Sequence, residues 1–375
     1  MRESIPFIDL QAQRRRIKPE IDQAIARVLE HGRFIMGPEV AELETRLSEF
    51  CGARHTIVCA SGTDALALAL MAWETGPGHA VFVPAYTFVA TAEVVAWCGA
   101  TPVFVDVLED TFNMDPASLE VAIAAAPEMG LTPKAVIPVD MFGLPANYPA
   151  ILPLAEKHGL PVLADAAQSF GATLGGQRMG TFGQITATSF FPAKPLGCYG
   201  DGGAVFTGDD GLDHILRSLR VHGQGGDKYD NVRIGINGRL DTLQAAILLQ
   251  KLTVFEDEIA ARTRVAARYG EGLREVARIP DTVEGVMSTW AQYTLLIENR
   301  DRVAARLKEA GIPTAIYYPI PLNAQKGYMK YPSVPGGVPV SDNLATRAIS
   351  LPMHPYLEAP VQDRIIEAVR EAVQK

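Results

Sequence analysis

Short apolar runs recur along the first two thirds of the chain, and most gaps between them are long enough for a helix. Seven runs stand out, at residues 55–60, 81–84, 102–106, 135–139, 161–164, 185–191 and 203–207. Several are continuous stretches of β-branched or apolar residues, as in strands that helices cover on both faces. The alternation predicts an α/β fold whose large domain holds a mainly parallel seven-stranded sheet. A Gly-rich turn separates the last two runs, so the sheet can be mixed.

The pattern changes beyond about residue 270, where strands and helices no longer alternate regularly. We expect a large domain over residues 1–250 and a smaller C-terminal α+β domain over residues 251–375, in line with about 150 residues per domain. Further strands are expected at 290–298 and 313–318. Further helices are expected at 10–31, 38–50, 241–267, 302–310 and 361–373. The Pro- and Gly-rich stretch 332–339 is expected to be an exposed loop.

Composition excludes several classes of protein. Hydrophobic residues make up 48% of the chain and charged residues 21%, which is ordinary for a globular protein. The net charge of −9 argues against a surface for nucleic acids or anionic membranes. No apolar run approaches the ~20 residues of a membrane span, and residues 1–6 lack the apolar core of a signal peptide. The four cysteines lack metal-binding spacing. We therefore expect a cytoplasmic protein with reduced thiols, no metal site, and no nucleic-acid or membrane partner.

Chemically useful residues follow several of the predicted strands, where α/β proteins bind ligands. Ser61, Gly62 and Thr63 open a helix after the first strand, and the free N–H groups there can bind an anion. A simple capped helix start would look the same. Phe88 follows the next strand and could stack on a planar ring, although an aromatic residue there can equally belong to the core.

Two charged residues follow later strands. Asp165 comes directly after an apolar strand, where a buried carboxylate needs a cation or a protonated ring nitrogen; alternatively, it caps a helix. Lys194 lies beside Pro195 in a Gly-rich turn, where burial would make its amine nucleophilic, although most lysines in turns are simply solvated. An anion site, a stacking aromatic, a carboxylate and an amine together meet the needs of pyridoxal phosphate.

Three longer motifs extend this pattern. They are DAAQ at 165–168, SFFPAKPLG at 189–197 and NGRLDTLQAA at 237–246. With them, nearly the whole chain resembles the DegT-type nucleotide-sugar aminotransferases, which have fold type I of the pyridoxal-phosphate enzymes. Some relatives carry His in place of the lysine and act as sugar dehydratases. This sequence has Lys194, which favours amino transfer.

The resemblance implies a role for each residue of the cofactor site. Lys194 would form a Schiff base with the cofactor and then move the proton between substrate and cofactor. Asp165 would pair with the pyridinium nitrogen, Gln168 would contact the phenolic side of the ring, and Phe88 would stack on it. The phosphate would be held by Gly62, Thr63, Ser189 and, from the neighbouring subunit, Asn237. The resemblance thus implies a homodimer with active sites shared between subunits.

The substrate is expected to be a keto nucleotide sugar, aminated by an amino acid such as glutamate. Segments 319–323 and 351–357 look like a subgroup that aminates the 3-keto group of a UDP-N-acetyl-hexuronic acid in surface polysaccharide (lipopolysaccharide O-antigen) synthesis. Arg239 could grip a sugar carboxylate, or could form a structural ion pair with Asp241 or another acid. Tyr317, expected to bind substrate, stands where this subgroup often has His. The alternatives are a 4-keto-6-deoxy sugar substrate and a cofactor-binding regulatory protein.

Overall fold

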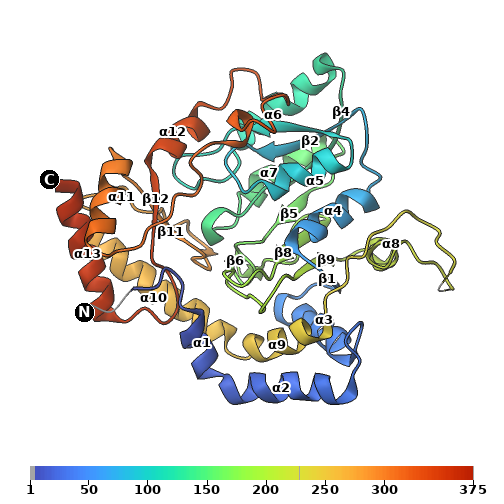
Figure 1. The fold of residues 1–375 in the computed structure, drawn as a ribbon. Helices are drawn as coiled ribbons and strands as arrows, with labels where there is room; N and C mark the ends of the chain where they lie inside the picture. Colours follow the sequence, from blue (N-terminus) through green and yellow to red (C-terminus); the bar gives the residue numbers. More distant parts are fainter. Residues whose placement is uncertain (1–4, 228, 375) are drawn as a thin grey trace.

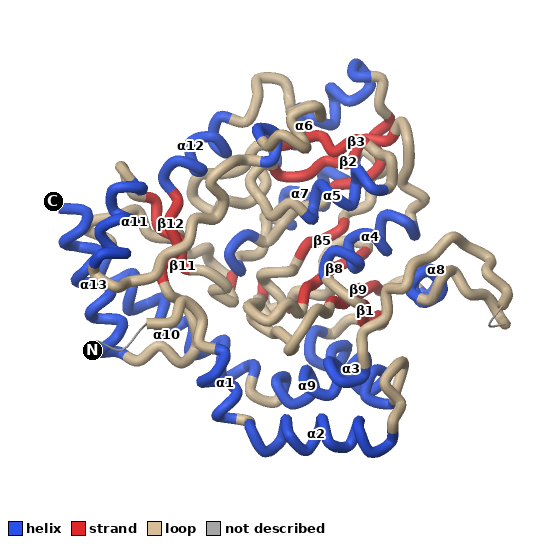
Figure 2. Tube along the Cα trace, viewed as in Figure 1, coloured by secondary structure: helices blue, strands red, loops and turns tan. Residues whose placement is uncertain are grey.

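The computed structural model describes residues 5–227 and 229–374. Its central sheet combines a four-stranded and a three-stranded group, and helices surround it (Figures 1 and 2). Four strands pair in the order β1 (His55–Cys59), β9 (Gly203–Thr207), β8 (Ile185–Ser189) and β5 (Leu163–Asp165). Three more pair in the order β4 (Thr132–Val136), β2 (His79–Pro84) and β3 (Thr101–Val105). Parallel bridges from Val136 to Val162 and from Val139 to Asp165 join the two groups. Because only β9 runs antiparallel to its neighbours, the expected mixed, mainly parallel sheet is confirmed.

Helices cover both faces of this sheet. They are α3 (Pro38–Cys51), α4 (Gly62–Ala72), α5 (Ala90–Trp97), α6 (Pro116–Ala125), α7 (Tyr148–Lys157), α8 (Asp210–Arg220) and α9 (Thr242–Leu252). Ile57 and Cys59 of β1 belong to one buried cluster, and Val58 between them belongs to another. Successive side chains of a strand point to opposite faces, so both faces of β1 are buried.

The C-terminal part forms a separate buried cluster around a two-stranded antiparallel ladder. The ladder pairs β11 (Tyr293–Leu296) with β12 (Ala348–Leu351). The helices of this part are α10 (Phe255–Leu273), α11 (Arg300–Glu309), α12 (Pro339–Arg347) and α13 (Ala359–Gln374). Short pieces complete the fold: β6 (Thr173–Leu174), β7 (Gln177–Arg178), β10 (Val286–Met287), η1 (Ala126–Met129), η2 (Met141–Gly143) and η3 (Leu322–Ala324). The domain division at residue 250 stays a prediction.

Two helices that we expected to be continuous are broken. Stretch 10–31 forms α1 (Leu10–Arg16) and α2 (Lys18–His31), because Pro19 has no N–H to give to the preceding turn. Stretch 241–267 breaks between α9 and α10. There the hydroxyl of Thr253 donates to the Gln250 carbonyl at 2.6 Å and competes with the helix backbone.

Two further expectations were wrong. Stretch 313–318 is no regular strand, since only Ala315 bridges to Ser350. Stretch 332–339 is not simply an exposed loop. Val334 donates its amide to Phe104 at the edge of β3, and Val334 and Val338 are buried, because the open edge of β3 offers unpaired backbone groups. In the described part of the chain, no helix is long and apolar enough to cross a membrane.

Candidate active site

The carboxyl ends of the central strands place the start of α4 against the end of β8. Cys59 of β1 and Ser189 of β8 both pair with Gly203 of β9. The Ser61 hydroxyl accepts the Asp64 amide at 3.0 Å, which caps α4 and leaves Gly62 and Thr63 in its first turn. A Cβ on residue 62 would come within 2.6 Å of the Ser189 Cβ. Only glycine leaves room here, so the free amides at the start of α4 lie beside the Ser189 hydroxyl in one corner of the molecule.

Asp165 is the last residue of β5 and is almost completely buried. Its carboxylate accepts hydrogen bonds from the Thr91 hydroxyl at 3.0 Å and from the Ala167 amide at 3.2 Å. Burial raises the pKa of Asp165. No helix follows it in the described structure, so the alternative of a helix cap was wrong. Among the described residues no cation forms an ion pair with this buried carboxylate, which suits it to a cationic ligand group.

Lys194 lies in the loop after β8 and is half-buried. Its amide donates to the Phe191 carbonyl at 2.8 Å, and in the part of the chain that the structure describes its side chain forms no ion pair. Burial lowers the pKa of Lys194, an effect that the nearby Asp165 charge opposes. A lysine of this kind is a better nucleophile than a solvated one.

Helix α9 supports the Lys194 loop through residues that the sequence analysis missed. The Lys251 amine donates to the Gly197 carbonyl at 2.6 Å and lies over the Tyr199 ring, 4.2 Å from its centroid. The Gln244 side chain accepts the Tyr199 amide at 2.9 Å. Both contacts join residues far apart in sequence, so no local pattern signals them.

The remaining candidates for binding the cofactor ring are Gln168 and Phe88. Gln168 is buried, and its side-chain oxygen accepts the Phe142 amide at 2.9 Å. Phe88 is 52% exposed, with its ring centroid 6.3 Å from that of Tyr318. Phe88 is therefore no core residue and is free to meet a ligand. Tyr318 was missed because its contacts with Phe88 and with the Tyr86 hydroxyl, which accepts the Tyr318 amide at 2.9 Å, join residues far apart in the sequence.

The predicted substrate and partner-site residues are Asn237, Arg239 and Tyr317. Asn237 is exposed. Arg239 forms no ion pair among the described residues, and its buried Nε has no hydrogen-bond partner there, so the expected alternative of a pair with Asp241 was wrong. Tyr317 packs edge-on against Phe7, with ring centroids 6.5 Å apart.

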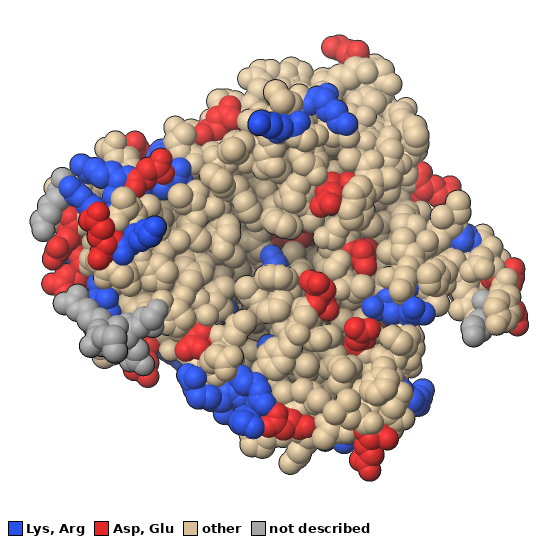
Figure 3. Space-filling view, in the orientation of Figure 1, with Lys and Arg blue, Asp and Glu red and all other residues tan. Residues whose placement is uncertain are grey.

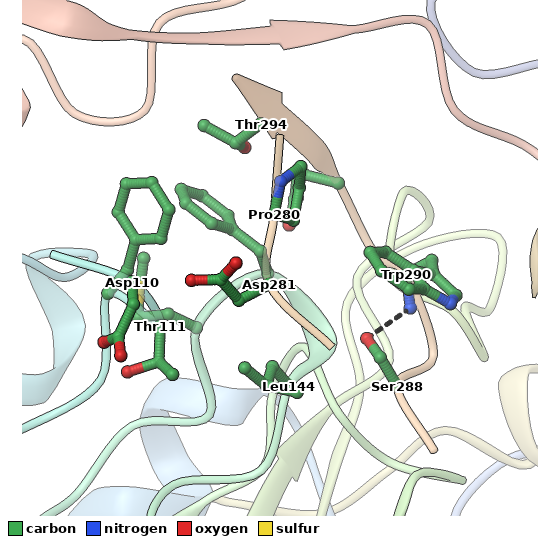
Figure 4. Close-up of a pocket in the computed structure, with 12 residues that line it drawn as sticks. Asp110, Thr111, Leu144, Pro280, Asp281, Ser288, Trp290 and Thr294 are labelled. Atoms are coloured by element: carbon green, nitrogen blue, oxygen red, sulfur yellow. Dashed lines mark hydrogen bonds between the residues drawn. The ribbon is translucent and has the colours of Figure 1, made fainter. Parts of the chain in front are cut away.

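Figure 3 shows a hollow near the centre of one face, with basic and acidic atoms visible inside it. Beside the Lys194 loop lies a small cavity of about 20 Å³, which Glu258, Arg262 and His354 also line. His354 is 3% exposed, and neither ring nitrogen has a partner in the described structure. A second cavity, of about 30 Å³, lies between β11 and the turn after β4, and Asp110, Thr111 and Asp281 line one side of it (Figure 4). Lys194 does not line this second cavity, but Phe142 does, and its amide donates to the Gln168 side chain.

The geometry fits pyridoxal phosphate. Phosphate needs amide and hydroxyl donors, which the close approach of Gly62 to Ser189 brings together. A protonated ring nitrogen needs a buried carboxylate, and an aldehyde needs an amine of lowered pKa. The described residues contain no group of three or more His, Cys, Asp or Glu side chains that could hold a metal ion.

The fold and this site define a pyridoxal-phosphate-dependent aminotransferase, and sequence comparison gives the family. The chain belongs to the DegT/DnrJ/EryC1/StrS aminotransferase family, whose profile matches residues 15–370. The chain is 51% identical to UDP-2-acetamido-2-deoxy-3-oxo-D-glucuronate aminotransferase of Pseudomonas aeruginosa, over 94% of this chain and 96% of that protein. It is 42% identical to UDP-N-acetyl-3-dehydro-alpha-D-glucosamine 3-aminotransferase of Acidithiobacillus ferrooxidans, over 99% and 98%. A DegT/DnrJ/EryC1/StrS aminotransferase from Brucella abortus superposes with a TM-score of 0.98 at 55% identity, covering 99% of this chain and 100% of that one.

Proposed function

We propose that this enzyme transfers an amino group from an amino acid, with glutamate as the expected donor, to the 3-keto group of a UDP-N-acetyl-hexuronic acid. The observation that carries this proposal is the 51% identity, along nearly the full length of both chains, to an enzyme named for a 3-oxo-glucuronate substrate. The second relative is also named for a 3-keto UDP-sugar, but for one without a uronic acid. The 3-keto position therefore has more support than the 4-keto-6-deoxy alternative.

Pyridoxal phosphate, when bound, supplies a conjugated ring that stabilises negative charge at the substrate carbon. We assign the reacting groups of the chain around that ring. The Lys194 amine binds the cofactor aldehyde and moves the proton at the substrate carbon. The Asp165 carboxylate holds a proton on the ring nitrogen, Gln168 contacts the phenolic oxygen, and Phe88 covers one ring face.

The phosphate is assigned to the corner that Gly62, Thr63 and Ser189 form. The close approach of Gly62 to Ser189 supports this, as does the N-terminal position of both Gly62 and Thr63 in α4. Free amides at a helix N-terminus bind phosphate because they point along the positive end of the helix dipole.

We further propose a homodimer in which each active site uses Asn237 and Arg239 of the partner subunit. Asn237 is exposed, and Arg239 has a buried nitrogen without a partner in the described part of its own chain. The segment after α8 projects from the body of the molecule (Figure 1), and its Ile234 is 92% exposed. An apolar side chain on such an extension is suited to burial against a second subunit.

In this arrangement Arg239 recognises the substrate. A guanidinium can grip a carboxylate with two parallel hydrogen bonds, which matches the uronic acid group. Tyr317 is assigned to the same substrate. We place the reaction in the cytoplasm, in the synthesis of lipopolysaccharide O-antigen or a related surface polysaccharide.

A panel of UDP-, GDP- and dTDP-linked keto sugars, with and without a uronic acid group, tests the substrate. We expect the purified enzyme to be converted by glutamate to its amine form and restored fastest by the UDP-linked 3-keto uronate. Preference for a 4-keto-6-deoxy sugar would contradict the proposal. Conversion by glutamate with no restoration by any keto sugar would favour a regulatory protein.

A further inference from the structure

Asp140 is a completely buried acid that the proposed function does not use. It lies after β4 with 0% exposure, and no Lys or Arg in the described structure pairs with it. Its carboxylate accepts hydrogen bonds from the Ala146 amide and the Tyr148 hydroxyl, both at 2.8 Å, and from the Ser169 hydroxyl. Burying a carboxylate without a cation is costly, so three donors directed at one group call for an explanation.

The contacts of Asp140 connect two segments that meet at the candidate site. Ala146 and Tyr148 belong to the turn and helix after β4, whereas Ser169 belongs to the turn after β5. The Asp140 amide also donates to the Asp165 carbonyl at 3.1 Å, and the Asp165 amide donates to Pro138 at 2.9 Å. Asp140 therefore fixes the end of β5, where Asp165 lies, against the end of β4.

The same turn sets the orientation of Gln168. The Phe142 amide, two residues after Asp140, donates to the Gln168 side-chain oxygen at 2.9 Å. The Thr289 hydroxyl donates to the Gln168 carbonyl at 2.7 Å. Ser169, the residue after Gln168, donates its hydroxyl to the Asp140 carboxylate, so Asp140 also anchors the backbone next to Gln168.

The Asp140 and Asp165 carboxyl groups also interact through their charges. Burial and, to a smaller extent, the Asp165 charge raise the pKa of Asp140 to about 7, although its three hydrogen bonds oppose the rise. Tyr148, the other titratable group facing Asp140, is held neutral because burial raises its pKa. A cation bound at Asp165 would favour the ionised form of Asp140, and Asp140 would favour that cation in return.

We propose that Asp140 is a positioning residue that holds Asp165 and Gln168 in place and supplies a second negative charge behind Asp165. This inference rests on the proposed pairing of Asp165 with the cofactor's ring nitrogen. Asp140 would then help to keep that nitrogen protonated without touching the cofactor.

The test is a pH titration of the cofactor's visible absorbance in the holoenzyme, with the cofactor Kd measured in parallel. Asp140→Asn keeps the shape and removes the charge, which disfavours the protonated form of the bound cofactor. We expect the absorbance midpoint to fall by about one pH unit and the Kd to rise roughly tenfold. Asp106→Asn is the matched control. Asp106 is another buried acid, and it accepts the Ser341 amide at 2.9 Å, in the C-terminal part of the chain. The control should lower the Tm and leave the midpoint unchanged.

An unchanged midpoint in Asp140→Asn, or an equal shift in Asp106→Asn, would overturn the inference. If Asp140→Asn does not fold, Ser169→Ala removes one donor to the carboxylate and should shift the midpoint in the same direction by a smaller amount; no shift there would equally overturn it. Failure of the wild-type enzyme to form an absorbing adduct with the cofactor would instead refute the proposed function.

Discussion

The backbone of Gly62 lies directly against the side chain of Ser189, so that a Cβ on residue 62 would come within 2.6 Å of the Ser189 Cβ. The same added Cβ would lie 3.1 Å from the Ser189 Cα, which belongs to a buried strand and cannot move aside easily. This contact joins the start of α4 to the end of β8. It brings the proposed phosphate donors together.

Gly62→Ala is expected to weaken cofactor binding, because the added methyl group forces α4 away from β8. Overpacking of this kind costs about 1–3 kcal/mol. We expect a lower Tm and a higher Kd for pyridoxal phosphate. Gly208→Ala is the control, since an added Cβ there meets nothing within 4 Å. An unchanged Kd for pyridoxal phosphate in Gly62→Ala would show that residue 62 does not belong to the phosphate site.

Lys194→Ala should fold, because a half-buried loop lysine contributes little packing. It should bind the cofactor without the colour of the covalent adduct and should not turn over. Absorbance spectra and steady-state assays check this, with circular dichroism as the folding control. Steady-state turnover by this variant would refute the proposed mechanism.

Asp165→Asn preserves the shape of the side chain and removes its charge. The ring nitrogen then loses its stabilising partner, and proton abstraction should slow by several kcal/mol of transition-state stabilisation, on the order of 10²–10³-fold. Rapid-reaction measurements of the half-reaction with glutamate would show the loss. Turnover at the native rate would reduce Asp165 to a structural role.

Two inactive variants should restore activity when mixed, if the sites are shared. Lys194→Ala supplies intact Asn237 and Arg239, and the Asn237→Ala/Arg239→Ala variant supplies intact Lys194. A mixed dimer then has one complete site, and random exchange would recover up to about a quarter of native activity. If differently tagged chains show that subunits exchange but no activity is recovered, then Asn237 and Arg239 act in the site of their own chain or in no site.

His354 should make stability depend on pH. Burial and, to a smaller extent, the Arg262 charge lower the pKa of His354 to about 4, against about 6.5 in the unfolded chain. Between these values the unfolded state binds a proton that the folded state does not, so stability is lost as pH falls below about 6.5. We expect His354 to account for a loss of about 2 kcal/mol between pH 7 and pH 5.

Urea unfolding of the wild type and His354→Gln, compared at both pH values, isolates this effect. The difference between their free energies of unfolding should change by that amount. A difference that does not vary with pH would mean that His354 titrates normally in the folded protein. Replacing the exposed His158 by Gln controls for general effects of removing a histidine.

Local sequence patterns were sufficient to predict the strands of the central sheet and much of the candidate site. Continuous apolar runs mark strands that are buried on both faces, and the residues that follow them must lie at the ligand-binding edge. Asp165 and Lys194 could therefore be assigned to the same edge of the sheet from local patterns alone. Of the two helix breaks, the one at Pro19 has a local signal, whereas the one at Thr253 involves a single side-chain hydrogen bond that the sequence does not reveal.

The sequence by itself determined the order of the strands along the chain and which residues follow them, because hydrophobic periodicity and helix-opening residues are local properties. Only the tertiary structure decided that Thr91 bonds Asp165, that Lys251 and Gln244 hold the Lys194 loop, and that Asp140 joins two turns. Thr91 and Asp165 are 74 residues apart, and Lys251 and Gly197 are 54 apart. Contacts between such distant residues depend on how the strands and helices pack together, and no repeat or spacing along the chain encodes that.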